Sequence, residues 1–328
     1  GAPAPAPETL VPEPELPPPP ATSPAPRTAQ PDSTAAVASP PPAIRSGADW
    51  LLRWRARLAD TPCIEDRVVQ RWEQTYARWP LRFSAQVEAV LPLLALALES
   101  LEGQALPAEF ALLPIVESWY RLDAGHAGAT LGMWQFGVPT ARNQGIRILG
   151  GYDGRMAPAE STRAAMRYLS ELMNRFGDWR LATMAYNAGE YRLARVLARS
   201  SSPEVSSEQH RPQGLSPVTY EHLAKLRALA CVFAEPGRFG IDLPTATRIE
   251  PLRAVVLSGN ETSLDQISAR TGTPSERVRA LNPAFIGARI VDGATREVLL
   301  PESAAMRYVR TATSANEARR AAPASVAE

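Results

Sequence analysis

Cysteine and unbalanced charge are both scarce in this chain of 328 residues. Two cysteines, Cys63 and Cys231, are too few for the disulfide scaffold that holds many small secreted domains together. They leave two alternatives open, one bridge in an oxidising compartment or two separate buried thiols. Lysine plus arginine numbers 35 and aspartate plus glutamate 34, and no basic run occurs. This balance gives no electrostatic case for nucleic-acid binding, so we expect no nucleic-acid partner.

Long hydrophobic runs are also missing. No stretch of 18 apolar residues occurs, so we expect no transmembrane span. The length is sufficient for two domains with a substantial core. We expect no metal site and no cofactor.

Aromatic residues are absent before Trp50, and 15 of the 32 prolines lie at or before Pro42. Such a segment cannot bury enough apolar surface to offset the entropy lost on ordering. Residues 1–46 are therefore predicted to be a disordered Pro/Ala-rich tether. The sequence LPPPP within it could alternatively be a ligand for a proline-reading domain.

Helical periodicity begins at Asp49, and strand signals stay weak up to about residue 247. Within this part, Ser161 is a plausible helix cap and Gly177 a helix stop. Residues 123–132 and 200–217 are expected to be loops. The segments predicted to be helical are 48–60, 67–83, 84–103, 106–118, 158–177, 178–200 and 219–236.

The pattern changes after residue 247. A strand over 252–258, helices over 263–272 and 274–283, and a strand over 296–301 are predicted. Together they form a small strand–helix–helix–strand unit. The residues after Pro301 are Ala-rich and polar and are expected to be a frayed tail.

Glu117 is the first candidate functional residue, because it follows seven uncharged residues, Phe110 to Val116. A glutamate at a helix end most often pairs with an arginine and has no catalytic role. At the end of a buried helix, however, a carboxyl loses hydration, which favours the protonated form that a general acid needs. Pro114 removes a backbone donor three residues upstream and is expected to kink the helix.

Two further motifs raise the probability of a site. Residues Gly132 to Phe136, GMWQF, combine a glycine, large apolar side chains and an amide, a combination found in sugar-binding clefts. Residues Met184 to Gly189, MAYNAG, place a phenol beside an amide where a helix ends. Each motif alone is weak, because tryptophan and phenylalanine are usually core residues and Asn187 could simply be a cap.

The ordered series Glu117-Ser118, Gly132-Met133-Trp134-Gln135 and Ala185-Tyr186-Asn187-Ala188-Gly189 resembles the catalytic domain of soluble lytic transglycosylases, in the lysozyme superfamily. The flanking phrases resemble the branch of membrane-bound lytic murein transglycosylase D. The resemblance covers roughly residues 50 to 301.

The resemblance implies a peptidoglycan lytic transglycosylase. This family cleaves the β-1,4 bond between N-acetylmuramic acid and N-acetylglucosamine without water and leaves 1,6-anhydro-muramic acid. Carried over, Glu117 is the single acid and base, and Ser118, Met133, Trp134, Gln135, Tyr186 and Asn187 bind substrate. For Trp134, a structural role is as plausible as a contact with sugar. Possible second carboxylates are Asp123, Asp153 and Asp178, but the last two are more typical of a turn and a cap.

Three residues depart from the family pattern. His126 lies at or near a family serine, and we expect it to face solvent. Val218 and His222 replace a family glutamate and a family tyrosine that lines the cleft near the acid. We expect the absence of that tyrosine to affect the rate or the substrate preference.

The resemblance also sets the expected fold and domains. The fold class is mainly α: a lysozyme-like domain preceded by N-terminal helices and followed by a small α+β module that resembles a degenerate LysM unit. That module would either bind N-acetylglucosamine chains or serve only as a packing domain. The expected boundaries are 1–46 tether, 47–104 N-terminal helical region, 105–247 catalytic domain, 248–302 LysM-like module and 303–328 flexible tail.

Two alternatives to the transglycosylase remain: a goose-type lysozyme-like hydrolase, and a non-catalytic glycan-binding envelope scaffold on the same fold. The expected partners are peptidoglycan glycan strands and possibly a cell-envelope protein reached by the Pro-rich arm. The implied location is periplasmic or envelope-associated after export, although the sequence as given starts at Gly1 and contains no signal peptide.

Overall fold

The computed structural model describes residues 42–102, 104, 106–200, 205, 210–258 and 260–321, with side chains described as far as residue 312. Most of the predicted tether, and much of the predicted loop 200–217, lie outside the described residues. Residues 42–46, however, differ from the predicted disorder. Ile44 is fully buried, and its backbone N–H donates to Glu99 at 2.8 Å. The neighbouring Arg45 carbonyl accepts from Ile249, so this segment pairs with the linker that follows the helical part.

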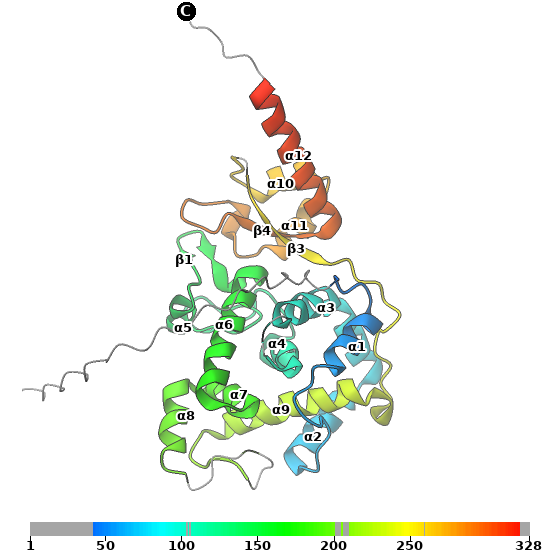
Figure 1. Cartoon of the computed structure of the whole chain (residues 1–328), viewed down its shortest axis with the longest axis vertical. Coiled ribbons are helices and arrows are strands. Elements are labelled where there is room, and N and C mark those ends of the chain that lie inside the picture. Colours follow the sequence, from blue (N-terminus) through cyan, green and yellow to red (C-terminus); the bar gives the residue numbers. More distant parts are fainter. Residues whose placement is uncertain are drawn as a thin grey trace, which may run out of the picture. The chain divides into compact units, whose positions relative to one another are not determined.

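The prediction of a mainly α protein is confirmed (Figure 1). Helices α3 and α6 are the longest in the helical part. Its elements are α1 Gly47–Arg55, α2 Arg67–Ala77, α3 Pro80–Leu101, the 3-10 helix η1 Ala108–Leu112, α4 Leu113–Ser118, α5 Val138–Asn143, the hairpin β1 Ile148–Leu149 and β2 Tyr152–Asp153, η2 Gly154–Met156, α6 Pro158–Phe176, α7 Trp179–Ala188, α8 Glu190–Leu197, α9 Pro217–Ala234 and η3 Pro236–Phe239.

Local sequence explains most helix boundaries. The side chains of Asp66 and Asp178 accept from backbone N–H groups in the first turns of α2 and α7, as helix caps do. Helix α6 ends at Gly177, whose φ is 70°, as predicted. Its predicted cap is wrong, because the helix already begins at Pro158. Ser161 lies inside it and donates its hydroxyl to the Ala157 carbonyl at 2.7 Å.

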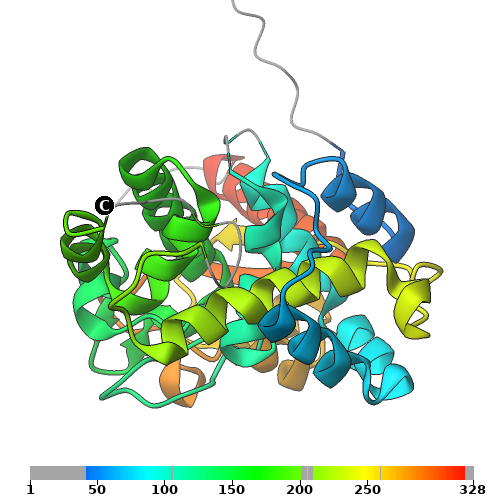
Figure 2. The same ribbon diagram turned by 90° about the horizontal axis from the view of Figure 1, so that it is seen from below.

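Helix α9 is the centre of the helical part. It runs the length of this part with α2 alongside (Figure 2) and also packs against α7, η1 and α4. Its residues Leu226, Leu229 and Val232 are fully buried. A helix that is apolar on nearly every side has to be surrounded by other elements, which is the arrangement observed.

An aromatic cluster joins α9 to the first helix and to η1. The rings of Trp50 and Trp54 stack with centroids 5.7 Å apart, and Phe233 meets Trp50 at 5.6 Å. The Trp54 indole also donates to the Ala108 carbonyl at 2.9 Å. Helix α1 therefore contributes both tryptophans to the core and fixes the start of the segment that leads to Glu117.

Helix α3 is, by length and composition, the one helix among the described residues that could cross a membrane. In this fold Val87, Leu91, Leu94 and Leu98 are nevertheless 0–2 % exposed and belong to the same core. This packing is typical of a core helix.

The C-terminal module has the predicted order of strand, helix, helix and strand. Strands β3 Leu252–Val256 and β4 Glu297–Pro301 pair antiparallel, with Leu252 opposite Pro301, and they flank α10 Leu264–Thr271 and α11 Ser275–Leu281, with the short η4 Ile286–Ala288 before β4.

The residues after Pro301 do not begin a flexible tail. They continue as α12 Glu302–Ala321, and Ala304, Ala305 and Tyr308 are buried in the module core. The Tyr308 hydroxyl donates to Glu261 at 2.9 Å. The small alanine side chains let α12 pack closely against the module core. The polar composition of this segment gave no sign of this packing in the sequence.

A disulfide joins Cys63, between α1 and α2, to Cys231 on α9. This geometry selects the bridge over two separate thiols. The two cysteines are 168 residues apart in the sequence. Because closing so long a loop removes much entropy from the unfolded chain, the bridge should stabilise the fold considerably.

We expect replacement of both cysteines, Cys63→Ser with Cys231→Ser, to lower the free energy of unfolding by about 2–5 kcal/mol. Urea unfolding with and without a reductant measures this. The wild type should lose stability on reduction and the double variant should not respond. A wild type equally stable in both conditions would contradict the prediction.

Glu109, in η1, is a buried carboxyl that accepts hydrogen bonds from the backbone. It is 2 % exposed, and its two oxygens accept from the Ala59 N–H at 2.9 and 3.2 Å. Burial raises the pKa of Glu109 to about 7, and the nearby Asp60 carboxylate adds to this effect. Between about pH 4.5 and pH 7, Glu109 therefore keeps its proton in the folded protein, whereas in the unfolded chain it has released it.

Because the folded-state pKa is raised, Glu109 should reduce stability as the pH rises from about 4.5 towards 7. We expect the free energy of unfolding to fall between pH 5 and pH 8 by about 2 kcal/mol more in the wild type than in Glu109→Gln. Denaturant unfolding at both pH values checks this. Equal pH dependence in the two proteins would show that Glu109 does not titrate between them.

Candidate functional site

Glu117 lies at the end of α4, next to the C-terminal residue Ser118. The predicted single helix 106–118 is two helices, because η1 turns into α4 at Leu113. Pro114 is in the first turn of α4, where its missing N–H costs nothing, so it starts the helix and does not kink it. After Ser118 the chain reverses sharply, with Trp119 and Tyr120 at φ values of 55° and 58°. Because the chain turns back here, α4 ends one residue after Glu117, and its buried residues Leu113, Pro114 and Ile115 precede the acid.

Helix α9 supplies the hydrogen-bond partner of the acid. His222 Nε2 is 2.7 Å from Glu117 Oε1, and the side chains are 8 % and 14 % exposed. Sequence reasoning identified His222 as a departure from the family pattern but did not predict this contact. Val218, the other departure on α9, is 65 % exposed. No spacing in the sequence signalled this contact; in the structure His222 lies one helical turn after Thr219, which contacts the third motif.

The second motif forms a tight loop whose backbone holds the other two motifs. The Ser118 hydroxyl donates to the Met133 carbonyl at 2.9 Å. The Tyr186 hydroxyl donates to the next carbonyl, that of Trp134, at 2.7 Å. The three motifs predicted to form one site are thus brought together by hydrogen bonds to two successive peptide groups.

Met133 and Trp134 do not present their side chains to a cleft, contrary to the predicted substrate contacts. They are 1 % and 0 % exposed, and the Trp134 indole donates to Thr162 on α6 at 3.0 Å. A side chain without exposed surface cannot touch a sugar in this conformation. Of the two readings weighed for Trp134, the structural one describes this fold.

The Gln135 amide fastens its own loop. Its nitrogen donates to the carbonyls of Gly132 at 2.7 Å and Ala124 at 3.0 Å, and its oxygen accepts from Thr130 at 2.8 Å. The half-buried Gln135 is therefore a loop tie in this structure. His126, in the same loop, is exposed as expected.

Tyr186 and Asn187 lie at the end of α7. The Tyr186 ring contacts Phe136 and Tyr168 at centroid distances of 6.1 and 5.6 Å. Burial, and next the negative charge of Glu117, raise the pKa of Tyr186 well above its usual value, so its hydroxyl remains a donor. The exposed Asn187 accepts from Thr219 on α9 at 2.9 Å.

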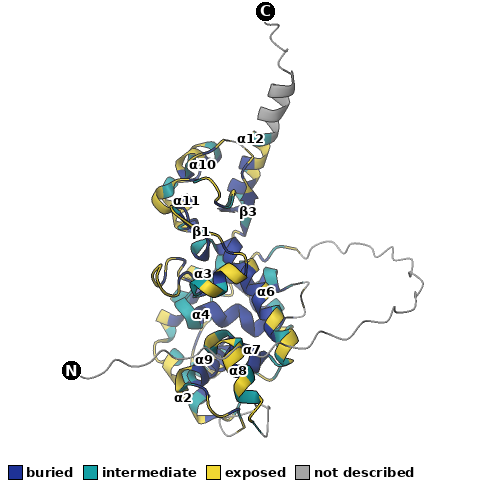
Figure 3. Ribbon diagram, turned by 90° about the vertical axis from the view of Figure 1, so that its left-hand side faces the viewer, coloured by how far each residue is buried: buried dark blue, intermediate teal, exposed yellow. Residues whose placement is uncertain are grey.

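Arg155 clamps the loop from behind. Its fully buried guanidinium pairs with Asp153 at 2.7 Å and donates to the carbonyls of Ala127 at 2.8 Å and Ala129 at 2.7 Å. In Figure 3 the residues coloured as buried gather in the middle of the helical part, where α4 lies. A buried charge is stable here because each of the three guanidinium nitrogens donates to an acceptor.

The C-terminal module is fastened to the segment that carries Arg155. One oxygen of the Glu160 carboxylate accepts from Tyr152 at 2.5 Å and Thr295 of the module at 2.8 Å. The other accepts from the Arg147 N–H at 2.9 Å. The Tyr152 ring also packs on Phe285 of the module, with centroids 4.9 Å apart. The module thus supports the hairpin that supports the loop.

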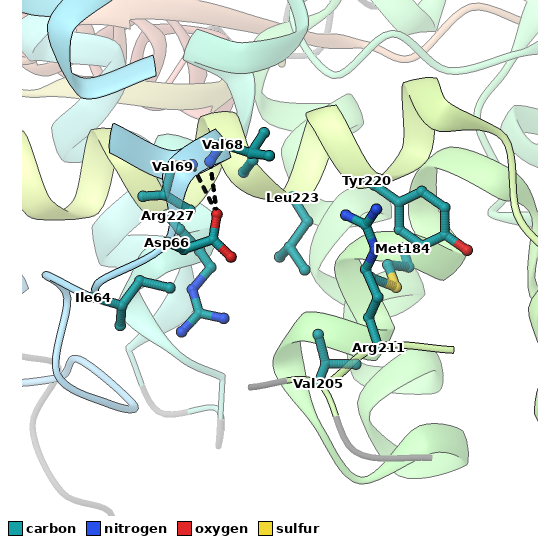
Figure 4. A pocket seen from close by; sticks show the side chains of 11 residues that line it. Ile64, Asp66, Val68, Val69, Met184, Val205, Arg211, Tyr220, Leu223 and Arg227 are labelled. Carbon is teal, nitrogen blue, oxygen red and sulfur yellow. Dashed lines mark hydrogen bonds between the residues drawn. The ribbon is translucent and has the colours of Figure 1, made fainter. Parts of the chain in front are cut away.

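One cavity lies elsewhere along α9; Met184 of the third motif lines it, but Glu117 does not (Figure 4). Tyr220, Leu223 and Arg227 line it from α9, and Asp66 lines it from the start of α2. Asp66 directs its carboxylate to the N–H groups of Val68 and Val69, as a helix cap. The cavity is therefore separate from Glu117.

Comparison with known families finds a match to part of the helical region. Residues 98–208 match the family described as "Transglycosylase SLT domain". These residues form an SLT domain. All three motifs lie within it, whereas His222 lies beyond the matched residues. The resemblance seen in the sequence is thereby confirmed for the catalytic domain.

Individual relatives agree with this result. Membrane-bound lytic murein transglycosylase D of Escherichia coli (strain K12) is 28 % identical over 198 residues, which are 60 % of this chain and 43 % of the relative. The protein of the same name from Escherichia coli O6:H1 matches equally. A protein of Alteromonas sp. (strain M-1), named for tributyltin chloride resistance, is 36 % identical over 108 residues, covering 33 % of this chain and 52 % of its own. The chain thus spans about half the length of these relatives or less.

Gly132 is essential to the loop of the SLT domain on geometric grounds. Its φ is 81°, and a Cβ atom there would lie 1.9 Å from the Arg155 carbonyl oxygen. Only glycine lets the loop rest on this part of the chain.

We expect Gly132→Ala to lower the free energy of unfolding by about 3 kcal/mol or more, because it adds a backbone clash to an unfavourable φ. Gly237→Ala is the matched control, since nothing lies within 4 Å of its added Cβ. Urea unfolding compares the two. Similar small losses in both variants would contradict the prediction.

Proposed function

We propose that the chain is a peptidoglycan lytic transglycosylase with Glu117 as its single acid and base. Glu117 donates its proton to the glycosidic oxygen between N-acetylmuramic acid and N-acetylglucosamine, and the C1–O4 bond breaks. The acetamido group of the substrate stabilises the cation that develops at C1. The Glu117 carboxylate then takes the proton of the C6 hydroxyl, whose oxygen bonds to C1 and closes the 1,6-anhydro ring.

The observation that carries this proposal is the position of Glu117 in the SLT domain. Glu117 lies at the end of a buried helix. The hydroxyl of its neighbour Ser118 is hydrogen-bonded to Met133 of the second motif, and Tyr186 of the third motif is hydrogen-bonded to Trp134 of the second. The relatives named as lytic murein transglycosylases support the substrate class.

The state of two of the three possible second carboxylates, Asp153 and Asp178, supports a route with one carboxylate. Asp153 is bound to Arg155 at 2.7 Å and is buried. Asp178 caps α7 and pairs with Arg180, and these bonds hold its pKa below the usual value. Carboxylates engaged in this way are poor candidates for the second acid of a two-carboxylate glycosidase, so substrate assistance is the better description.

Substrate contacts are proposed for the exposed or half-buried motif residues. Asn187 is exposed, and Ser118, Gln135 and Tyr186 are half-buried. For Met133 and Trp134 we propose a supporting role through their carbonyl groups, because their side chains are buried.

We also propose an exported, envelope location with peptidoglycan strands as partner. The Cys63–Cys231 disulfide supports an oxidising compartment. The unit over residues 248–302 is proposed to be LysM-like, on its strand–helix–helix–strand order. The catalytic boundaries 105–247 remain a proposal, since the family match covers residues 98–208.

Glu117→Gln tests the function. Purified peptidoglycan is incubated with the wild type or the variant, and soluble products are identified by mass spectrometry. We expect the wild type to release products ending in 1,6-anhydro-muramic acid. The variant should be slower by on the order of 1000-fold, because its amide cannot transfer a proton. Glu276→Gln, the same exchange at an exposed position of α11, should match the wild type.

The products also separate the alternatives. Reducing-end products would make the protein a goose-type lysozyme-like hydrolase. No soluble product, together with pelleting of wild type and variant with the wall, would make it a glycan-binding scaffold.

A further inference from the structure

The Glu117 carboxyl has one hydrogen-bond partner among the described residues, His222. The other polar groups near it are engaged elsewhere. The Ser118 hydroxyl is bound to the Met133 carbonyl, and the Tyr186 hydroxyl to the Trp134 carbonyl. The orientation of the carboxyl plane therefore depends on the imidazole.

His222 is itself held in place. Thr219, one turn earlier on α9, is 2 % exposed and donates to Asn187. Leu226, one turn later, is fully buried, and Cys231 fixes the helix through the disulfide. His222 is 7 % exposed, so its ring meets the carboxyl from within the fold and offers little surface to a substrate.

The second ring nitrogen restricts the protonation state of His222. Nδ1 is buried and has no hydrogen-bond partner among the described residues. An imidazolium would place a charged, unpaired N–H in that position, which is costly. The ring is therefore best placed as a neutral imidazole with one proton.

The proton of the neutral ring can be on either nitrogen. If it is on Nδ1, a buried N–H is unpaired, and Glu117 has to donate its own proton to Nε2. That proton is then directed into the fold, away from any glycosidic oxygen. If the proton is on Nε2, the ring donates to Oε1 whether Glu117 is a carboxylic acid or a carboxylate, since Oε1 accepts in both forms.

We propose that His222 is a positioning residue for Glu117. The Nε2–H of His222 binds Oε1 of Glu117 and leaves Oε2 of Glu117 to carry the reacting proton. The proposal rests on the proposed function. Oε2–H gives its proton to the leaving oxygen, and Oε2 later accepts the proton of the C6 hydroxyl. The bond from Nε2–H to Oε1 is kept throughout, so the carboxyl need not reorient between the two transfers.

Three substitutions at His222 test this role. His222→Leu removes the donor. His222→Gln places an amide N–H near the position of Nε2, whereas the shorter His222→Asn places one near Nδ1, out of reach of Oε1. His210→Gln is the control, as the same exchange at an exposed histidine. Initial rates of 1,6-anhydro product release from soluble, uncrosslinked glycan strands give kcat and KM.

We expect His222→Leu and His222→Asn to lower kcat by about 10- to 100-fold, the effect of losing a hydrogen bond to a charged group. KM should change by less than about threefold, because the ring contacts the acid and not the sugar. His222→Gln should regain most of the wild-type kcat. An unchanged kcat in His222→Leu would overturn the proposal. So would a His222→Gln as slow as His222→Leu, because the imidazole would then itself exchange a proton.

A second measurement does not depend on activity or on the folding of the His222 variants. Nitrogen-15 NMR of histidine-labelled wild type, with the signals of His126 and His210 assigned by their glutamine variants, reports which ring nitrogen of His222 is protonated. We expect a neutral ring with its proton on Nε2. A proton on Nδ1, or on both nitrogens, would overturn the proposal. If the wild type released no anhydro product, the proposed function would fail while this result still decided the tautomer.

Discussion

Two neighbouring carbonyl groups, those of Met133 and Trp134, hold the candidate site together. One accepts from Ser118 beside the acid, and the other from Tyr186 at the end of α7. Their position is fixed because the Trp134 indole is anchored on Thr162. Helix α4 has six residues and would not be stable alone. The acid is therefore placed by the loop and by α9 more than by its own helix.

The features that sequence reasoning predicted well are those decided by local interactions. Apolar periodicity located the longer helices of the helical part, although it missed α5 and α12, and Gly177 and Asp178 marked the boundary between α6 and α7. The module's element order followed in the same way from strand and helix patterns. The ordered motifs predicted that Glu117, the loop and the end of α7 would meet, and their hydrogen bonds bring them together.

The features that it missed depend on residues far apart in the chain. The contact of His222 with Glu117 requires knowing how α9 faces α4, which no spacing within either helix reveals. A tryptophan such as Trp134 is equally typical of a cleft wall and of a protein core, and only the packing of the fold decides which role it has. The disulfide likewise depends on a distance across the fold. Ile44 is buried because the linker passes beside it, although its neighbours are typical of a disordered segment.

The contact of Thr295 with Glu160 has a consequence for how this protein can vary. Glu160 is buried, and its oxygens are shared between the hairpin and the module. Removing the module would leave a carboxylate and the Tyr152 ring facing water, on the side of the hairpin that leads to Arg155. The module is therefore not a detachable unit that could be exchanged for another of the same shape. A replacement would have to bring its own hydroxyl and its own aromatic ring to the same two places, so the two parts of the chain have to change together.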